Sequence, residues 1–196
     1  MGFSRAELES FRDREVPDLI GPGCRLLFVG INPGLWTAAT GAHFARPGNR
    51  FYPALLRAGI VDRSIDPTAG MSAADRDLLV RRGVGITNLV ARATARADEL
   101  TAEELRAGGQ RLREVVATVR PRVVAVAGIT AYRAAFGVRT ARKGRQPDGL
   151  EGVELWVVPN PSGLNAHDTV DTLAHAYRAA AVEAGVVEAS GTPVTD

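Results

Sequence analysis

Cysteine is nearly absent from this sequence, since Cys24 is the only one among 196 residues. A chain with one cysteine forms no internal disulfide, and it builds no zinc or iron–sulfur site from cysteine ligands. The three histidines, at positions 43, 167 and 175, show no metal-ligand spacing. The sequence therefore predicts no metal and no cofactor, so the chemistry must come from ordinary side chains and the backbone.

A long apolar run is also missing. No apolar segment reaches membrane-spanning length, and the first ten residues are charged rather than signal-like. With 45% hydrophobic and 23% charged residues, the composition is that of a globular domain and not of a disordered chain. We expect a soluble protein of the cytoplasm with no membrane partner. We place a single domain at residues 1–186 and a disordered C-terminal tail at 187–196.

Acidic residues are missing from one long stretch, although the net charge of the chain is only +2. No Asp or Glu occurs from Leu19 through Val61. Four arginines lie inside this stretch: Arg25, Arg46, Arg50 and Arg57. Such a segment suits a surface that faces a polyanion, and it also fits chance around a buried strand. The charge pattern leaves both interpretations open.

Apolar runs of strand length alternate with segments of helical pattern. Apolar runs predict buried strands at 25–31, 122–127 and 155–158, and a further short strand is expected at 84–90. Capping residues and spacing predict helices at 4–14, 49–58, 72–82, 101–119, 130–136 and 168–185, with Asp168 as the N-cap of the last. This alternation predicts an α/β fold, a three-layer α/β/α sandwich with a short, mainly parallel central sheet.

An Asn-Pro pair follows two of the expected strands. Asn32-Pro33-Gly34 comes after the first, and Asn160-Pro161-Ser162-Gly163 comes after the last. Each pair alone is an ordinary turn signal. Parallel strands, however, bring both loops to the same sheet edge, where ligands bind in open α/β folds. The sequence therefore places a candidate site at this edge.

The loop after the first expected strand is long, because no helical or strand periodicity is evident between Asn32 and Asn49. Structureless loops beyond about 12–15 residues are uncommon and usually functional. We expect Trp36 to pack into the core and Phe44 to lie over a planar ring of a ligand. Motifs typical of dinucleotide-binding proteins, P-loop nucleotide-binding proteins and serine hydrolases do not occur.

Three segments of this sequence carry a family resemblance. GINPGL (30–35) is followed by GAHF (41–44) and RPGNRFY (46–52), GITNLV (85–90) is followed by Arg92 and Thr94, and NPSGL occupies 160–164. In this order and spacing they resemble the motifs of the mismatch-specific uracil/thymine-DNA glycosylases, the MUG/TDG family. The resemblance runs from about Cys24 to Tyr177.

The resemblance implies a uracil-DNA-glycosylase-like fold and a monofunctional DNA N-glycosylase. Family members flip uracil, and in some cases thymine or exocyclic cytosine adducts, out of mispairs with guanine and excise it to begin base excision repair. The implied partner is double-stranded DNA with G·U or related mispairs, bound by a monomer in the cytoplasm at the bacterial nucleoid. No lysine lies near either Asn-Pro motif, which agrees with a reaction that has no covalent intermediate.

Residue roles follow from the same resemblance. Asn32 is the implied catalytic residue, whose carboxamide holds the water that attacks the sugar carbon C1′ without acting as a strong base. Phe44 stacks on the flipped base, and Thr37 lies near its 5-position. The implied substrate-binding residues are Ile31, Thr37, Phe44 and Asn160. The implied DNA-binding residues are Ser162, Gly163, Leu164, Arg142 and Lys143.

The sequence also departs from the family pattern. Asn165-Ala166 stands where a bacterial relative has Ser-Arg, Ala91 replaces an acidic residue, and Thr37 replaces Ser or Ala. These departures bear on the substrate range and leave the activity class unchanged. Two alternatives stay open, a catalytically weak DNA-lesion-binding protein and an unrelated α/β nucleotide-binding protein.

Overall fold

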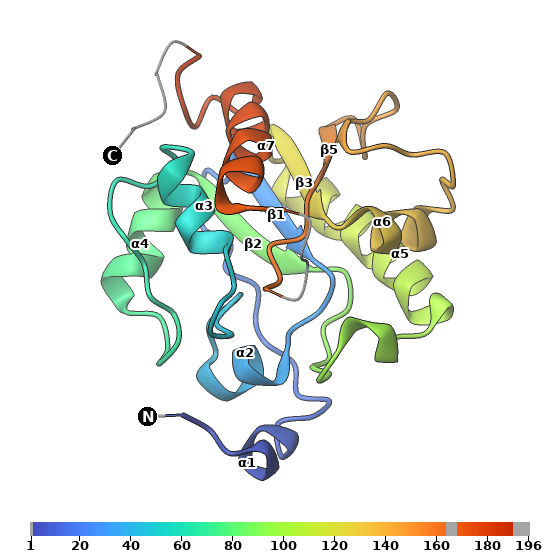
Figure 1. Ribbon diagram of the computed structural model, residues 1–196. Helices are drawn as coiled ribbons and strands as arrows, with labels where there is room; N and C mark the ends of the chain where they lie inside the picture. The colour runs from blue at the N-terminus through green and yellow to red at the C-terminus, as the bar shows by residue number, and fades with distance from the viewer. Residues whose placement is uncertain (1, 164–167, 190–196) are drawn as a thin grey trace.

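A five-stranded sheet forms the centre of the computed structural model, which describes residues 2–163 and 168–189. The strands are β1 (Leu26–Gly30), β2 (Val84–Asn88), β3 (Val123–Ala127), β4 (Gly144–Arg145) and β5 (Glu154–Val158). Their order is β2-β1-β3-β5-β4, and every pair is parallel except β4 with β5 (Figure 1). The mainly parallel sheet is confirmed, and the two-residue edge strand β4 is an addition to the expected set.

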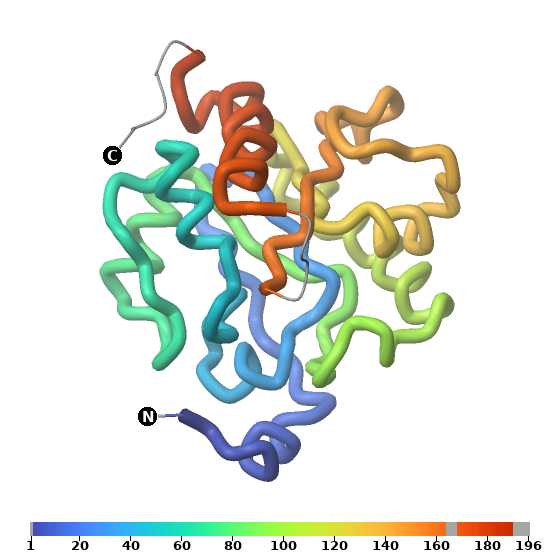
Figure 2. The backbone as a smooth tube through the Cα atoms, viewed as in Figure 1, coloured from blue at the N-terminus to red at the C-terminus, as the bar shows by residue number. Residues whose placement is uncertain are grey.

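Helices cover both faces of the sheet, so the three-layer α/β/α architecture is confirmed (Figures 1 and 2). One face carries α3 (Phe51–Arg57), α4 (Ala73–Arg81) and α7 (Val170–Glu183), and the other carries α5 (Ala102–Val119) and α6 (Ile129–Phe136). Along β1, Leu26 and Phe28 pack against the first group, whereas Leu27 and Val29 pack against the second. Because side chains alternate along a strand, a strand buried on both faces reads as a continuous apolar run.

The N-terminal helix α1 (Arg5–Glu9) is shorter than expected. Its capping box between Ser4 and Glu7 forms as predicted, but the helix ends at Glu9. The chain then adopts a left-handed conformation at Asp13 and pairs with the backbone of Ala93. This pairing takes the following residues away from the helical path.

The last helix begins one residue later than expected. Thr169 is the N-cap of α7, since its hydroxyl accepts from the backbone N–H of Thr172. The predicted cap, Asp168, instead directs its carboxylate to Lys143, with its Oδ2 3.2 Å from Nζ. The Asp168 carboxylate thus pairs with Lys143, and the Thr169 hydroxyl serves as the N-cap.

The segment between Asn32 and Asn49 is not structureless, contrary to expectation. It contains the helix α2 (Leu35–Thr40), which starts after Gly34 and ends at Gly41 in a left-handed conformation with φ 67°. A helix of six residues is too short to show a helical repeat in the sequence. None of the helices in the described part of the chain has the length and apolar character needed to span a bilayer.

Candidate active site

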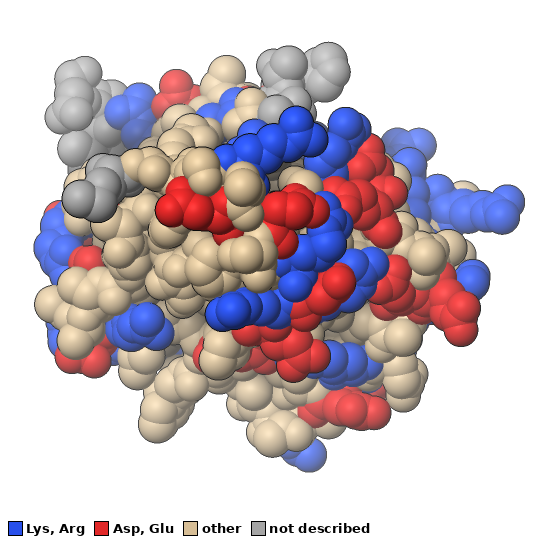
Figure 3. Space-filling model, turned by 90° about the horizontal axis from the view of Figure 1, so that it is seen from below, with Lys and Arg blue, Asp and Glu red and all other residues tan. Residues whose placement is uncertain are grey.

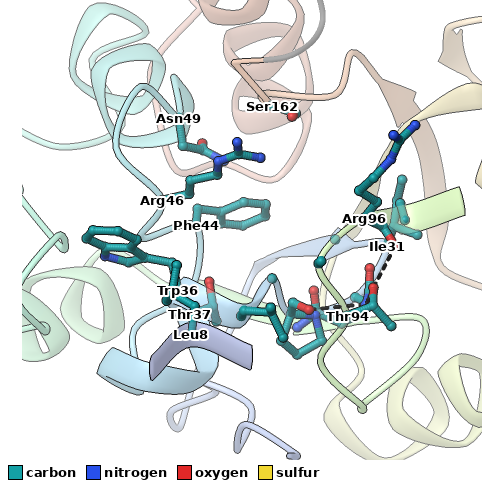
Figure 4. Close-up of a pocket in the computed structure, with 18 of the residues that line it drawn as sticks. Leu8, Ile31, Trp36, Thr37, Phe44, Arg46, Asn49, Thr94, Arg96 and Ser162 are labelled. Carbon is teal, nitrogen blue, oxygen red and sulfur yellow. Dashed lines mark hydrogen bonds between the residues drawn. The ribbon is translucent and has the colours of Figure 1, made fainter. Parts of the chain in front are cut away.

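A cavity of about 910 Å³ opens where the loops after β1, β2 and β5 meet. Asn32 from the first loop, Asn88 from the end of β2 and Asn160 from the last loop all line it. The two Asn-Pro loops therefore lie at one edge of the sheet, as their place after parallel strands predicts. Figure 4 shows Phe44 and Ile31 on opposite sides of this cavity.

Asn32 is half-buried, and its amide nitrogen is held by the loop after β2. Nδ2 donates to the carbonyl of Arg92 at 3.1 Å and to Oγ1 of Thr94 at 2.8 Å. The Thr94 hydroxyl donates its only hydrogen to the carbonyl of Arg96 at 2.7 Å. Toward Asn32 this hydroxyl can therefore only accept. Because both groups accept, the Asn32 carboxamide must turn its nitrogen toward them. The oxygen Oδ1 is therefore turned away from them and is available to accept from a water.

Phe44 belongs both to the core and to the cavity. Its ring stacks on Phe51 with centroids 4.1 Å apart and an interplanar angle of 24°, and the half-buried residue also lines the cavity. Its backbone has φ 56°, a left-handed conformation that is rare for a bulky residue and recurs at functional sites. The structure thus presents Phe44 to the cavity, with one face supported by the core.

Trp36 packs against the core, as the sequence predicted, and it also lines the cavity. The residue is half-buried, and its Nε1–H donates to the carbonyl of Thr68 at 2.9 Å. Its ring meets that of Phe3 edge to face at a centroid distance of 5.0 Å. Trp36 thereby connects the cavity wall to the N-terminal segment.

The other expected substrate-binding residues line the cavity as well. Thr37 on α2 is buried, with 5% of its surface exposed, and Ile31 is half-buried. Asn160 uses its Oδ1 to accept from the backbone N–H of Ser162 at 3.0 Å, which closes a tight turn in the last loop. This turn gives Asn160 a part in shaping its own loop.

Arg50 connects the two Asn-Pro loops through hydrogen bonds. Its guanidinium donates to the carbonyls of Ser162 and Asp168, and its backbone N–H donates to Pro161 at 3.0 Å. The loops also touch directly, because a Cβ on Gly163 would lie 2.7 Å from the carbonyl oxygen of Gly48. Only glycine fits at position 163 in this arrangement.

The expected DNA-binding residues lie in different surroundings. Ser162 lines the cavity, and Arg142 is exposed, whereas Lys143 faces the carboxylate of Asp168. Leu164, expected to fill the gap in the base stack, lies outside the described residues, and so do Asn165 and Ala166.

The acid-free stretch does not form a continuous basic surface. Arg25 and Arg50 donate to backbone carbonyls, and Arg57 pairs with Asp171. Of its four arginines, Arg46 alone has a side chain that makes no hydrogen bond or ion pair with another described residue, and it lies exposed beside the cavity (Figure 4). Seen from the side of α1, basic and acidic side chains are interspersed (Figure 3).

A buried pair that the sequence interpretation did not single out also belongs to the site. Asn88 is 5% exposed and His43 is 3% exposed, and Nδ2 of the asparagine lies 3.3 Å from Nδ1 of the histidine. Burial lowers the pKa of His43, which favours the neutral ring. The position of Asn88 at the carboxyl end of β2 is a signal that could have found it. Nothing in the local sequence pattern of His43 indicated this partner.

Helix α1 forms the outer wall of the cavity. Leu8 faces the cavity beside Thr37 (Figure 4), and Arg12 on the same segment pairs with Glu99. Glu9 is the only acidic side chain among the described residues that line the cavity. Within residues 2–163 and 168–189, no group of three His, Cys, Asp or Glu side chains is arranged to hold a metal ion.

Comparisons with known proteins identify a family and a similar fold. The model of a family described as the uracil DNA glycosylase superfamily matches residues 17–183. The fold is similar to the solution NMR structure of a "putative Uracil DNA glycosylase" from Methanosarcina acetivorans, with a TM-score of 0.57 and 16% sequence identity. That similarity covers 89% of this chain and 98% of the other.

Proposed function

This chain belongs to the uracil DNA glycosylase superfamily, and from that premise we propose that it is a monofunctional DNA N-glycosylase that excises uracil from mispairs with guanine. The observation that supports this most strongly is the orientation of Asn32, whose Oδ1 is available to a water at the cavity. The finer parts of the proposal are the preference for guanine mispairs, the action of a monomer on nucleoid DNA and the absence of strand cleavage.

The proposed reaction is hydrolysis of the bond between the base and C1′ of the sugar. The water oxygen bonds to C1′, the glycosidic electron pair leaves with the base, and the water proton is released. Because a carboxamide is not a base, Asn32 orients the water without taking its proton. Bond breaking therefore precedes most of the water attack, and uracil departs as an anion. A cavity with few carboxylates does not oppose this anion, since Glu9 on the outer wall is paired with Arg12.

The cavity also offers what a flipped uracil needs. A ring stacked on Phe44 would have the Asn88 carboxamide at its edge, since both groups line the cavity beside Gly30. Uracil presents the acceptor O4 next to the donor N3–H, and a carboxamide presents a donor and an acceptor in the matching order. Thr37 is the proposed neighbour of the base's 5-position.

The proposed preference for mispairs rests on the cost of flipping. A base must leave the stack before it can enter the cavity, and a mispaired base leaves it more easily than a paired one. Ser162 lines the cavity, and Gly163 follows it in the same loop. We assign these two residues to the duplex side of the cavity.

The test is single-turnover cleavage of duplexes that carry G·U, G·T or A·U and of single-stranded uracil, with a chelator present throughout. We expect the G·U duplex to react fastest, to give an abasic site and to show no strand break before alkali. Asn32→Ala should lower the rate by roughly 10²-fold, the scale of one lost catalytic contact, and should keep duplex affinity. Binding of mispaired duplex without cleavage would favour the lesion-binding alternative. Free-nucleotide binding without duplex affinity would contradict the proposal.

A further inference from the structure

His43 lies against the carboxamide of Asn88, and both residues line the cavity. Its Nδ1 lies 3.3 Å from Nδ2 of Asn88, and its Nε2 lies 3.0 Å from the carbonyl oxygen of Pro17. Tyr52 donates its hydroxyl to the backbone carbonyl of His43 at 3.0 Å, which holds the histidine backbone in place. The ring therefore has one fixed neighbour at each nitrogen.

The neighbours of the ring decide where its hydrogen lies. The Pro17 carbonyl can only accept, so Nε2 must carry the hydrogen. In a neutral ring Nδ1 is then a bare acceptor, and only the NH₂ end of the Asn88 amide can face it favourably. The opposite amide orientation would place Oδ1 of Asn88 against the lone pair of Nδ1, and a buried acceptor would go unsatisfied.

Oδ1 of Asn88 lies beside Gly30, which lines the cavity. A Cβ built on Gly30 would lie 2.4 Å from Oδ1 of Asn88 and 3.4 Å from Cζ of Phe44. The amide oxygen and the edge of the aromatic ring therefore converge over the glycine of the first motif. A base stacked on Phe44 would meet the oxygen and the remaining N–H of the Asn88 amide in an order that cannot reverse.

We propose that His43 is a positioning residue that locks the Asn88 carboxamide in the orientation that accepts uracil and rejects cytosine. This inference rests on the proposed function of the cavity. Cytosine presents an amino donor where uracil has O4 and a bare N3 where uracil has N3–H. Against an amide fixed in this orientation, the amino group of cytosine would face the N–H of Asn88, and its bare N3 would face Oδ1 of Asn88. Both pairings are unfavourable. An amide free to turn over would pair with either base.

The charged groups near the ring leave this hydrogen-bond arrangement intact. Asp18 and Arg76 act on His43 through space and oppose each other. The carboxylate of Asp18 is already engaged, since it accepts from the Thr87 hydroxyl at 2.7 Å and from Arg111 at 3.0 Å. Neither charged group competes with Asn88 for Nδ1.

The first test is the tautomer of His43 in the whole protein, read from the ring ¹⁵N shifts and their couplings at neutral pH. The shifts should show hydrogen on Nε2 and a bare Nδ1. This measurement does not depend on catalysis, so it tests the lock even if the protein shows no glycosylase activity. A ring that carries its hydrogen on Nδ1 would overturn the inference.

The second test measures base selectivity with duplexes that carry 5-fluorouracil or 5-fluorocytosine opposite guanine. Fluorine improves both leaving groups, so both single-turnover rates become measurable. In His43→Phe the ratio of the uracil rate to the cytosine rate should fall by about 5- to 150-fold, the scale of one lost buried partner. His43→Gln, which offers one donor and one acceptor, should restore part of the ratio. His175→Phe, at an exposed site on α7, is the matched control and should leave the ratio unchanged.

The outcomes separate the lock from a general packing role. A variant that is merely less well folded would lower both rates together and keep the ratio, and that result would overturn the inference. If His43→Phe fails to fold, the wild-type ratio is measured as the pH falls, because a proton on Nδ1 forces the amide to turn. A ratio that stays constant while the ¹⁵N shifts show protonation of the ring would equally overturn it. Absence of any excision by the wild type would count against the proposed function alone.

Discussion

The amide nitrogen of Asn32 donates to the hydroxyl of Thr94 at 2.8 Å, across 62 positions of sequence. The hydroxyl in turn donates to the carbonyl of Arg96, so the chain of hydrogen bonds has one direction. This direction turns Oδ1 of Asn32 away from these acceptors, in a residue that lines the cavity. Thr94 therefore helps to set the orientation of the catalytic candidate, together with the carbonyls of Pro33 and Arg92.

The first prediction follows from this relationship. Thr94→Val keeps the shape of the side chain and removes the acceptor for Asn32, while the carbonyl of Arg92 still receives one hydrogen bond. We expect single-turnover cleavage of a G·U duplex to fall about 10-fold, on the scale of one hydrogen bond. Thr94→Ser keeps the hydroxyl and should stay near the wild-type rate. Equal rates for the valine and serine variants would contradict the orienting role.

Phe44 is expected to affect both substrate stacking and stability. Base–aromatic contacts are worth about 1–3 kcal/mol, so Phe44→Ala should lose roughly 5- to 150-fold in binding or cleavage of a G·U duplex. The ring also stacks on Phe51, and loss of this aromatic pair should cost about 0.5–1.5 kcal/mol of stability beyond the area that is exposed. Phe44→Tyr should keep most of both properties. Urea unfolding measured beside single-turnover kinetics checks this, and an alanine variant that is less stable but fully active would confine Phe44 to core packing.

Thr37 is the predicted determinant of thymine discrimination. One methyl group changes binding in a pocket by about 1–3 kcal/mol, and the branched threonine is stiff about χ1. The residue is buried at the cavity wall, so its side chain has little room to move away. We expect the single-turnover rate on G·U to be much higher than the rate on G·T. Thr37→Ala should narrow the ratio of the two rates, mainly because thymine is removed faster. A ratio that is identical in the wild type and the variant would show that the methyl group does not meet Thr37.

Buried His43 should make stability depend on pH. Its folded pKa lies below the ordinary value of 6.5, because desolvation opposes the charged ring. The unfolded chain therefore binds more protons below pH 6.5, and the free energy of unfolding falls as the pH drops through that range. The full contribution of His43 is present above about pH 6.5, and the loss reaches at most about 1.4 kcal/mol per pH unit.

The measurement for this prediction is denaturant unfolding of the wild type and of His43→Gln from pH 8 to 5. Carboxylates titrate in both proteins, so the difference between the two slopes isolates the histidine. We expect the wild type to lose stability more steeply with acidification. Parallel curves for the two proteins would show that His43 titrates alike in the folded and unfolded chain.

Several features of the fold are readable from local sequence alone. The apolar runs correctly predict β1, β3 and β5, because parallel strands covered on both faces carry mostly apolar residues. The short strand expected at 84–90 is confirmed as β2, although it contains Thr87 and Asn88. The capping boxes at Ser4 and Thr101 are also where the sequence predicts them. Short elements are not readable in this way: six residues of α2 and two of β4 hold too few side chains to display a period.

The sequence by itself therefore determined the order of strands and helices and the two Asn-Pro loops that share one sheet edge. Only the tertiary structure decided how the polar groups at that edge are oriented. The amide nitrogen of Asn32 is held by Thr94 and by the carbonyl of Arg92, and that of Asn88 faces His43, 45 positions away. These orientations depend on which donors and acceptors the packed loops bring within 3.5 Å, and no local pattern carries that information. The succession of strands and helices along the sequence follows from the local pattern of apolar residues. The direction of each hydrogen bond follows from partners that meet only after the chain has folded.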